Sequence, residues 1–130
     1  MQQHEITSAV DQSAGISDHE LAERAVFATL RVLGSRLAGG QTAHLASQLP
    51  PAFADAMPAQ GPGERFDLAE FYQRVAQIEG HGCTPEQARQ HARAVLAALK
   101  AGLTGHEYDH MASQLPAEYA DLLGTEPVQH

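Results

Sequence analysis

The chain has 130 residues, the usual size of one domain, and a formal net charge of −8 with its histidines neutral. Its 8 Lys and Arg residues are scattered and only 5% of residues are aromatic, which argues against a nucleic-acid partner and against an anionic membrane surface. We expect a soluble, cytoplasmic protein, because the single cysteine cannot form an internal disulfide, the N-terminus lacks a secretory pattern, and the longest apolar run, Ala94 to Leu99, is too short to span a bilayer.

The chain begins with a weakly patterned helix and a stronger second one. The opening helix has Ile6 and Val10 on its apolar face. The second helix is expected to begin at Ser17, because Ser followed three positions later by Glu20 has the spacing of a capping box. Its apolar stripe consists of residues at helical spacing: Ala22, Val26, Leu30, Leu33 and Leu37.

Glycines and prolines divide the rest of this first half. Gly39-Gly40 is expected to end the second helix, since glycine disfavours a helix interior. A short helix then follows over residues 41–49, and Pro50-Pro51 begins another over residues 52–57. Gly61-Pro62-Gly63 marks the break before the second half.

The second half opens with clearer helix-start signals. Asp67 with Glu70 is a capping pair, and Phe66 is placed to pack on Phe71 as a hydrophobic staple. The apolar residues of this helix recur at helical spacing as far as Gly80: Leu68, Phe71, Tyr72 and Val75.

The next helix is predicted to be long. Thr84-Pro85 followed by Gln87 combines an N-cap, a proline at the first helical position and a side chain able to reach back. A single apolar stripe continues along this helix: Ala88, Ala92, Leu96, Leu99 and Leu103.

The second half closes with short helices. Thr104 with Glu107 begins a helix that continues to Leu115. Pro116 interrupts it, and one or two further turns are expected up to Leu123. No segment of the chain alternates apolar and polar residues with β-branched enrichment, so we expect no strand.

The two halves repeat one another at a constant offset of 66 residues. Leu45-Ala-Ser-Gln-Leu-Pro50 returns as Met111-Ala-Ser-Gln-Leu-Pro116. The match extends to both sides: Leu30, Leu33 and Leu37 fall on Leu96, Leu99 and Leu103, Gly39 falls on Gly105, and His44 falls on His110. We therefore expect one all-α domain over residues 1–130, built from two tandem repeats of about four helices each, about 1–60 and 64–124, related by a pseudo-twofold axis, with a short tail over 125–130.

Glycines and a Gln-Leu-Pro string recur at matching positions in the two halves. The pattern comprises Phe71-x-x-x-Val75, Gly80, Ala92-x-x-x-Leu96-x-x-Leu99, Gly105 and Gln114-Leu-Pro116, with an earlier echo at Gly39 and Gln48-Leu-Pro50. In this pattern, and over nearly its whole length, the chain resembles the bacterial family known as domain of unknown function 2267. The resemblance implies an all-helical tandem-repeat protein from bacteria with no established activity and no catalytic residue to carry over.

The string His106-Glu107-Tyr108-Asp109-His110 matches the His-Glu-x-x-His signature of zinc hydrolases. Residues four apart share a helix face, so two imidazoles can bind one zinc ion while the glutamate activates a water molecule. Against this interpretation, the apolar side of the helix leaves both histidines facing solvent. That apolar side consists of Tyr108, Met111, Ala112 and Leu115.

A complete zinc site would also need a third ligand. The extended signature has a third histidine six residues on, but that position is Pro116. The remaining choices are Glu118, Glu126 and His130, none of which the sequence places near the motif. We therefore predict no metal site and no cofactor, and keep zinc binding or zinc-dependent hydrolysis through His106, Glu107 and His110 as the alternative.

Other reactive side chains give weaker signals. His44 with Ser47, and His110 with Ser113, are spaced three apart as a base and a nucleophile would be, but no orienting carboxylate accompanies both pairs. Cys83 precedes a helix N-terminus, where a thiolate is favoured. Since no base lies near Cys83 in the sequence, we interpret it as a turn residue.

The sequence thus favours a non-catalytic helical module. A fold of packing repeats, an acidic composition and the lack of a convincing active site indicate a protein partner or a homodimer, bound through helix faces. The Phe and Tyr side chains are interpreted as core residues because they fall on apolar stripes.

The histidine content predicts a pH-dependent self-association. Protonating all eight histidines changes the formal charge from −8 to −8 + 8 = 0. Histidine titrates near pH 6.5 when unperturbed, so repulsion between molecules should collapse between pH 7.5 and about 5.5. Light scattering at constant protein concentration should therefore rise across this interval, and a flat signal would contradict the prediction.

Overall fold

The computed structural model describes residues 2–16, 18–37, 39–57 and 64–123, and every regular element in these ranges is a helix. The helices of the first half are α1 (Gln3–Ala14), α2 (His19–Arg36), α3 (Gly39–Ala46) and α4 (Pro51–Ala54). Those of the second half are α5 (Leu68–Glu79), α6 (Pro85–Gly102), α7 (Gly105–Ala112), the 3-10 turn η1 (Ala117–Tyr119) and α8 (Ala120–Leu123). The all-α prediction is confirmed for the described ranges. None of these helices offers the length of apolar chain that crossing a membrane requires.

Corresponding helices of the two halves agree in length and order. The opening helices α1 and α5 have 12 residues each, the long helices α2 and α6 have 18, and α3 and α7 have 8. A short turn of helix begins directly after a proline at the end of each half, as α4 or as η1 with α8. The first three helices of the two halves therefore follow one another with the same lengths.

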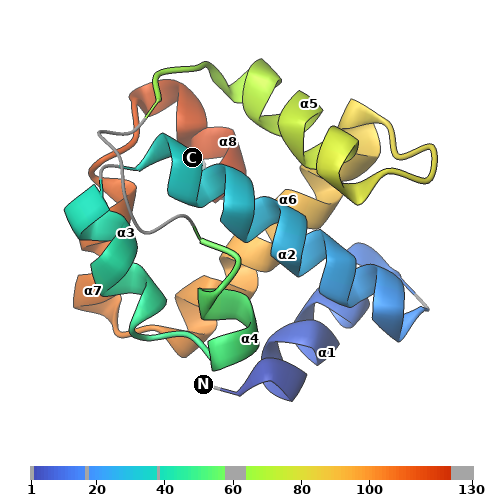
Figure 1. The fold of residues 1–130 in the computed structure, drawn as a ribbon, viewed down its shortest axis with the longest axis horizontal. Helices are drawn as coiled ribbons and strands as arrows, with labels where there is room; N and C mark the ends of the chain where they lie inside the picture. Colours follow the sequence, from blue (N-terminus) through green and yellow to red (C-terminus); the bar gives the residue numbers. More distant parts are fainter. Residues whose placement is uncertain (1, 17, 38, 58–63, 124–130) are drawn as a thin grey trace, which may run out of the picture.

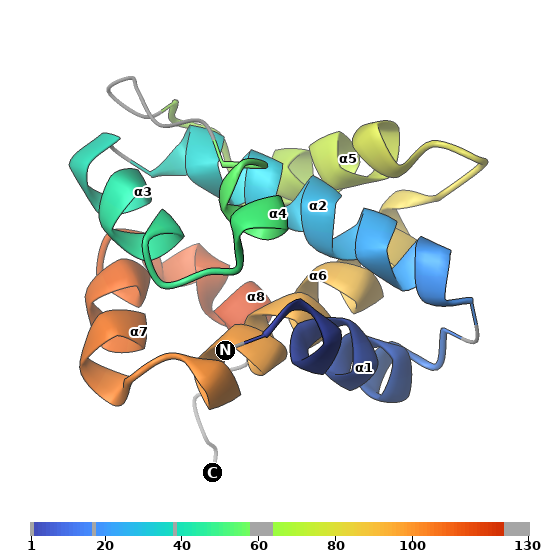
Figure 2. The same cartoon turned by 60° about the horizontal axis from the view of Figure 1, so that its bottom comes forward.

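The two halves share one core because the opening helix of each half packs against the long helices of both halves. The long helices α2 and α6 contact one another at the centre, and both α1 and α5 pack against both of them (Figure 1). Figure 2 shows the result as two layers, with α2 to α5 in one and α1 together with α6, α7 and α8 in the other. At one end of the molecule α3 contacts α7.

Helix starts follow the predicted capping chemistry. Three N-cap side chains accept a hydrogen bond from the backbone N–H three positions on: Asp67, Thr84 and Thr104. Gln87 also accepts from the Thr84 N–H, which completes a capping box. The rings of Phe66 and Phe71 lie 6.4 Å apart, as the predicted staple requires.

Two predicted boundaries in the first half are corrected by the structure. The N-cap of α2 is Asp18, whose carboxylate accepts from the Glu20 N–H, whereas the predicted cap Ser17 lies outside the described residues. Gly39-Gly40 forms the beginning of α3 rather than a break, because α2 has already ended at Arg36. The break predicted at residues 61–63 also lies outside the described ranges.

The core follows the predicted apolar stripes with one exception among the aromatic residues. All ten stripe residues named for the two long helices are buried, including Leu37 and Leu103 just beyond the ends of α2 and α6. Phe27 was predicted to be core, but it is 41% exposed. Its position is about 100° around the helix from the buried Val26, so it falls outside the buried face of α2.

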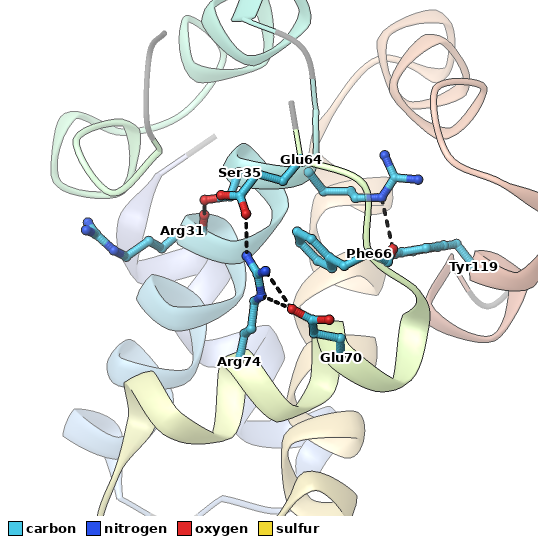
Figure 3. Close-up of polar contacts among 8 residues, drawn as sticks. Arg31, Ser35, Glu64, Phe66, Glu70, Arg74 and Tyr119 are labelled. Carbon is cyan, nitrogen blue, oxygen red and sulfur yellow. Dashed lines mark hydrogen bonds and ion pairs between the residues drawn. The ribbon is translucent and has the colours of Figure 1, made fainter. Parts of the chain in front are cut away.

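Phe66 fixes the beginning of the second half to the rest of the molecule (Figure 3). Its carbonyl oxygen accepts hydrogen bonds from Arg36 Nε at 3.2 Å and from the Tyr119 hydroxyl at 2.7 Å. The Arg74 guanidinium lies 3.9 Å from the centroid of its ring and forms an ion pair with Glu70 at 2.6 Å. These contacts join α2, α5 and η1, so this end of α5 is held in a defined place.

A second polar cluster holds α8 to α5 and α6. Arg89 donates two hydrogen bonds to the Asp121 carboxylate, at 2.9 and 2.7 Å, and the Tyr72 hydroxyl donates a third at 2.7 Å. The hydrogen bonds from Arg89, supported by the one from Tyr72, lower the pKa of Asp121 to about 2. The charged carboxylate is therefore stabilised by folding.

This cluster predicts how stability depends on acid. Because the folded pKa of Asp121 is depressed, its contribution is fully present above the unfolded value near 3.9 and is lost as pH falls toward about 2. Asp121→Asn should lower the free energy of unfolding at pH 7 by about 1 kcal/mol, a figure reduced for partial solvent screening. Urea unfolding of both proteins should show this difference shrinking between about pH 5 and pH 2. A difference that is constant with pH would contradict the assignment.

Candidate functional site

The two histidines of the His-Glu-x-x-His string lie on the solvent side of α7. His106 and His110 are both exposed, as predicted, and their rings stack with centroids 6.3 Å apart. The buried side of α7 carries Tyr108 and Met111. The two imidazoles therefore share one face, as the motif requires, but that face is open to solvent.

Glu107 points away from these histidines and into the contact between α3 and α7. It is buried, and its Oε1 lies 2.6 Å from Nε2 of His44, which is itself mostly exposed. The backbone N–H of Glu107 donates a hydrogen bond to the Thr104 hydroxyl oxygen at the start of α7, but the Glu107 side chain does not complete a capping box there. This pair could not be predicted from the sequence, because His44 and Glu107 belong to different halves of the chain.

The candidate third ligands do not complete a site on α7. Glu118 is exposed, and its carboxylate accepts from the Leu68 N–H at 3.5 Å. Glu126 and His130 lie outside the described residues. Within the described part of the chain, the one group of three His, Cys, Asp or Glu side chains with converging ligand atoms does not include this motif.

The serines near the repeated histidines are engaged with the backbone. The Ser47 hydroxyl donates to the carbonyl oxygen of His44 at 2.6 Å, and the Ser113 hydroxyl donates to that of His110 at 2.7 Å. Each hydroxyl thus bonds to the main chain of the histidine and not to its imidazole. The nucleophile–base pairing that the sequence indicated only weakly is therefore not formed in either half.

The converging group lies instead at the turn between α5 and α6. Glu79, the last residue of α5, has a side chain only 1% exposed, and both of its oxygens lie close to Nδ1 of His91, at 2.9 and 3.0 Å. The Cys83 thiol donates to Oε1 of Glu79 at 3.6 Å. Burial, with a further contribution from the Glu79 charge, raises the pKa of the Cys83 thiol to about 11.

This group corrects the interpretation of Cys83 as a residue without a nearby base. Glu79 lies four positions before Cys83 and His91 eight positions after it, and the turn brings both to the sulfur. The sequence did contain a signal for this group. The turn between the two predicted helices is short, so it had to bring the last residues of the first helix close to the first turns of the second.

A groove crosses α2 on another part of the surface. Its volume is about 500 Å³, and α1, α2, α4 and α5 all contribute to its walls. The two large hydrophobic side chains that are exposed among the described residues, Phe27 (41%) and Ile78 (36%), both line it. The buried Phe53 contributes to its lining, and the polar residues around it are Gln3, Glu20, Glu23 and Arg24.

A comparison with known families gives one finding. Residues 3–122 match the model of a family described as "Uncharacterized conserved protein (DUF2267)", which confirms the resemblance inferred from the repeated pattern. No curated protein matches the chain. This family description assigns no activity, so the geometry of the chain is the remaining guide to its function.

The geometry of α7 predicts unequal effects of mutations within the His-Glu-x-x-His string. Glu107→Ala removes a buried, partnered carboxylate and should lower the free energy of unfolding by about 1–2 kcal/mol. His106→Ala and His110→Ala, both exposed, should change it by no more than about 0.5 kcal/mol. Urea unfolding of the three variants measures this, and a larger loss for the histidine variants would contradict the roles assigned here.

Proposed function

The chain belongs to the DUF2267 family, and we propose that it is a non-catalytic interaction module whose groove binds an amphipathic helix of a basic protein partner. The observation that carries the proposal is that Phe27 and Ile78 are both exposed and both line the same groove. Contiguous apolar surface ringed by polar residues is typical of a protein-binding site.

The shape and lining of the groove suit a helical segment. Phe27 and Ile78 provide exposed apolar surface from two different helices, and Phe53 adds a buried aromatic surface. A helix that places apolar residues at positions i, i+3, i+4 and i+7 can set two large side chains into such a groove. A volume of about 500 Å³ can accommodate side chains of this size.

Charge favours a basic partner over a second copy of the chain. Glu20 and Glu23 lie on the rim, and the whole chain carries a formal charge of −8. Two copies repel one another at neutral pH, whereas Lys and Arg residues flanking an apolar helix face are attracted to this rim. The alternative of a homodimer through the same face is an outcome that the experiment below distinguishes.

The exposed residues are not a consequence of the repeat. The counterpart of Phe27 at the offset of 66 is Arg93, and the counterpart of Ile78 at the offset of 65 between α1 and α5 is Ser13. Neither of the two exposed apolar residues is therefore reproduced by the repeat. A feature that packing does not require, and that the repeat does not reproduce, is a reasonable site for binding.

We also propose that the two halves are related by a pseudo-twofold axis and that the protein is cytoplasmic. The equal lengths of corresponding helices support a pseudo-twofold relation between residues 18–57 and 84–123, which superposition in an experimental structure would test. A cytoplasmic location is consistent with the single cysteine. The proposed binding requires no covalent chemistry and no cofactor.

A designed peptide tests the groove. The probe is a fluorescent amphipathic helix of about 18 residues made of leucine and lysine, with a leucine–glutamate helix of the same pattern as the charge control. At pH 7.5 and physiological salt, the leucine–lysine helix should bind, and the double variant Phe27→Ser/Ile78→Ser should weaken its binding at least about tenfold. Ala97→Ser, at an exposed position of α6 away from the groove, is the control variant and should leave binding unchanged.

Sedimentation of the same proteins distinguishes a basic partner from a second copy of the chain as the occupant of the groove. The wild-type protein should be a monomer at micromolar concentration and pH 7.5. A dimer that the Phe27→Ser/Ile78→Ser variant abolishes would replace the basic partner by a second copy. Peptide binding that the double variant does not weaken would remove the groove from the proposal altogether.

A further inference from the structure

Three side chains with different donor atoms converge where α5 turns into α6. They are the carboxylate of Glu79, the thiol of Cys83 and the Nδ1 nitrogen of His91, and these ligand atoms all lie within 4.8 Å of one another. Glu79 is buried, whereas Cys83 and His91 are partly accessible. We call this group the Glu79–Cys83–His91 cluster.

Two of the three separations between the donor atoms are close to those of a tetrahedral zinc site, and all three are within 4.8 Å. Zinc binds sulfur at about 2.3 Å and nitrogen or oxygen at about 2.0–2.2 Å, so two ligands of one tetrahedral ion are about 3.3–3.7 Å apart. The Cys83 sulfur lies 3.6 Å from Glu79 Oε1, and His91 Nδ1 lies 2.9 Å from the same oxygen. The second distance needs to open by only a few tenths of an ångström.

We propose that Glu79, Cys83 and His91 bind one zinc ion. This assignment departs from the prediction that the chain carries no metal, and it uses none of the residues of the His106–His110 motif. The proposal also does not depend on the groove, since zinc can bind to these three residues whether or not a partner occupies the groove. The combination of thiolate, imidazole and carboxylate is a donor set that zinc accepts and that magnesium and calcium do not favour.

The charges of the cluster balance those of the ion. On binding, the thiol proton leaves to solvent and Cys83 coordinates as thiolate, while His91 coordinates through Nδ1 and keeps its proton on Nε2. With Glu79 ionised, two negative ligands and one neutral ligand then surround a doubly positive ion, so the buried carboxylate becomes part of a neutral assembly. Three protein ligands leave the fourth tetrahedral position to water, which the partial exposure of Cys83 and His91 permits.

The backbone of the turn directs Cys83 back toward Glu79. Gly80, His81 and Gly82 all have positive φ, at 66°, 54° and 76°, and the Cys83 N–H donates to the Gly80 carbonyl oxygen at 3.0 Å. For His81 this left-handed conformation is uncommon, because its Cβ crowds the main chain. Because the chain turns back sharply here, the Cys83 sulfur lies close to the Glu79 carboxylate.

Metal titration with cobalt(II) and zinc(II) tests the cluster on the whole chain, kept reduced. Because Cys83 is the single cysteine of the chain, any thiolate-to-cobalt charge-transfer band must come from it. We expect one equivalent of cobalt with such a band, and displacement of the cobalt by zinc. Cys83→Ser should abolish the band, and Cys83→Ser and His91→Gln should each weaken zinc binding by about 100-fold or more, exceeding the losses typical of residues that only support a ligand.

The double variant His106→Gln/His110→Gln is the matched control, since it removes two exposed histidines outside the cluster. It should keep both the band and the zinc affinity. Circular dichroism without metal establishes that each variant is folded, and Cys83→Ser changes a single atom. Absence of stoichiometric binding by the wild-type protein would overturn the proposal. Binding lost only in the His106→Gln/His110→Gln variant would overturn it in favour of the α7 motif.

Discussion

The structure depends on the mutual burial of the long helices α2 and α6. Each has more apolar surface than one neighbour can cover, and each is covered by the other and by both opening helices, α1 and α5. A half of about 60 residues would bury too little surface to be stable by itself. Because α1 and α5 each pack against both long helices, the two halves form a single core. The chain is therefore stable as a whole, although its sequence is built from two similar parts.

Within this core, two carboxylates are buried and each is close to a histidine from another helix. Glu107 of α7 pairs with His44 of α3, and Glu79 of α5 lies against His91 of α6. A buried carboxylate without a partner would carry a large desolvation cost, so each pairing constrains how its two helices approach. The consequences differ, however. The His44–Glu107 pair joins the two halves, whereas the Glu79–His91 pair lies beside the Cys83 thiol, where we propose a zinc site.

The groove and the proposed zinc cluster meet at the end of α5. Ile78 forms part of the groove, and the next residue, Glu79, is the buried ligand of the cluster. An ion held by Glu79 would fix the last turn of α5 to the beginning of α6, and so fix the backbone that presents Ile78. Before the other end of the same helix, the Phe66 carbonyl oxygen bonds to side chains of α2 and η1, and the Arg74 guanidinium of α5 packs on the Phe66 ring. The helix that carries one wall of the groove is thus anchored near its start by polar contacts and near its end by the residues of the cluster.

The sequence by itself determined the helices, most of their starts and the identity of the core. N-caps at Asp67, Thr84 and Thr104 were predictable because capping acts over three or four residues, and the buried stripes of α2 and α6 because burial follows the helical period. The sites were not predictable in this way. The exposure of Phe27, the pairing of Glu107 with His44 and the approach of His91 to Glu79 depend on how helices cross and which faces they cover. Only the tertiary structure decides these, since local propensity and periodicity contain no information about which distant residue will fill the space beside a side chain.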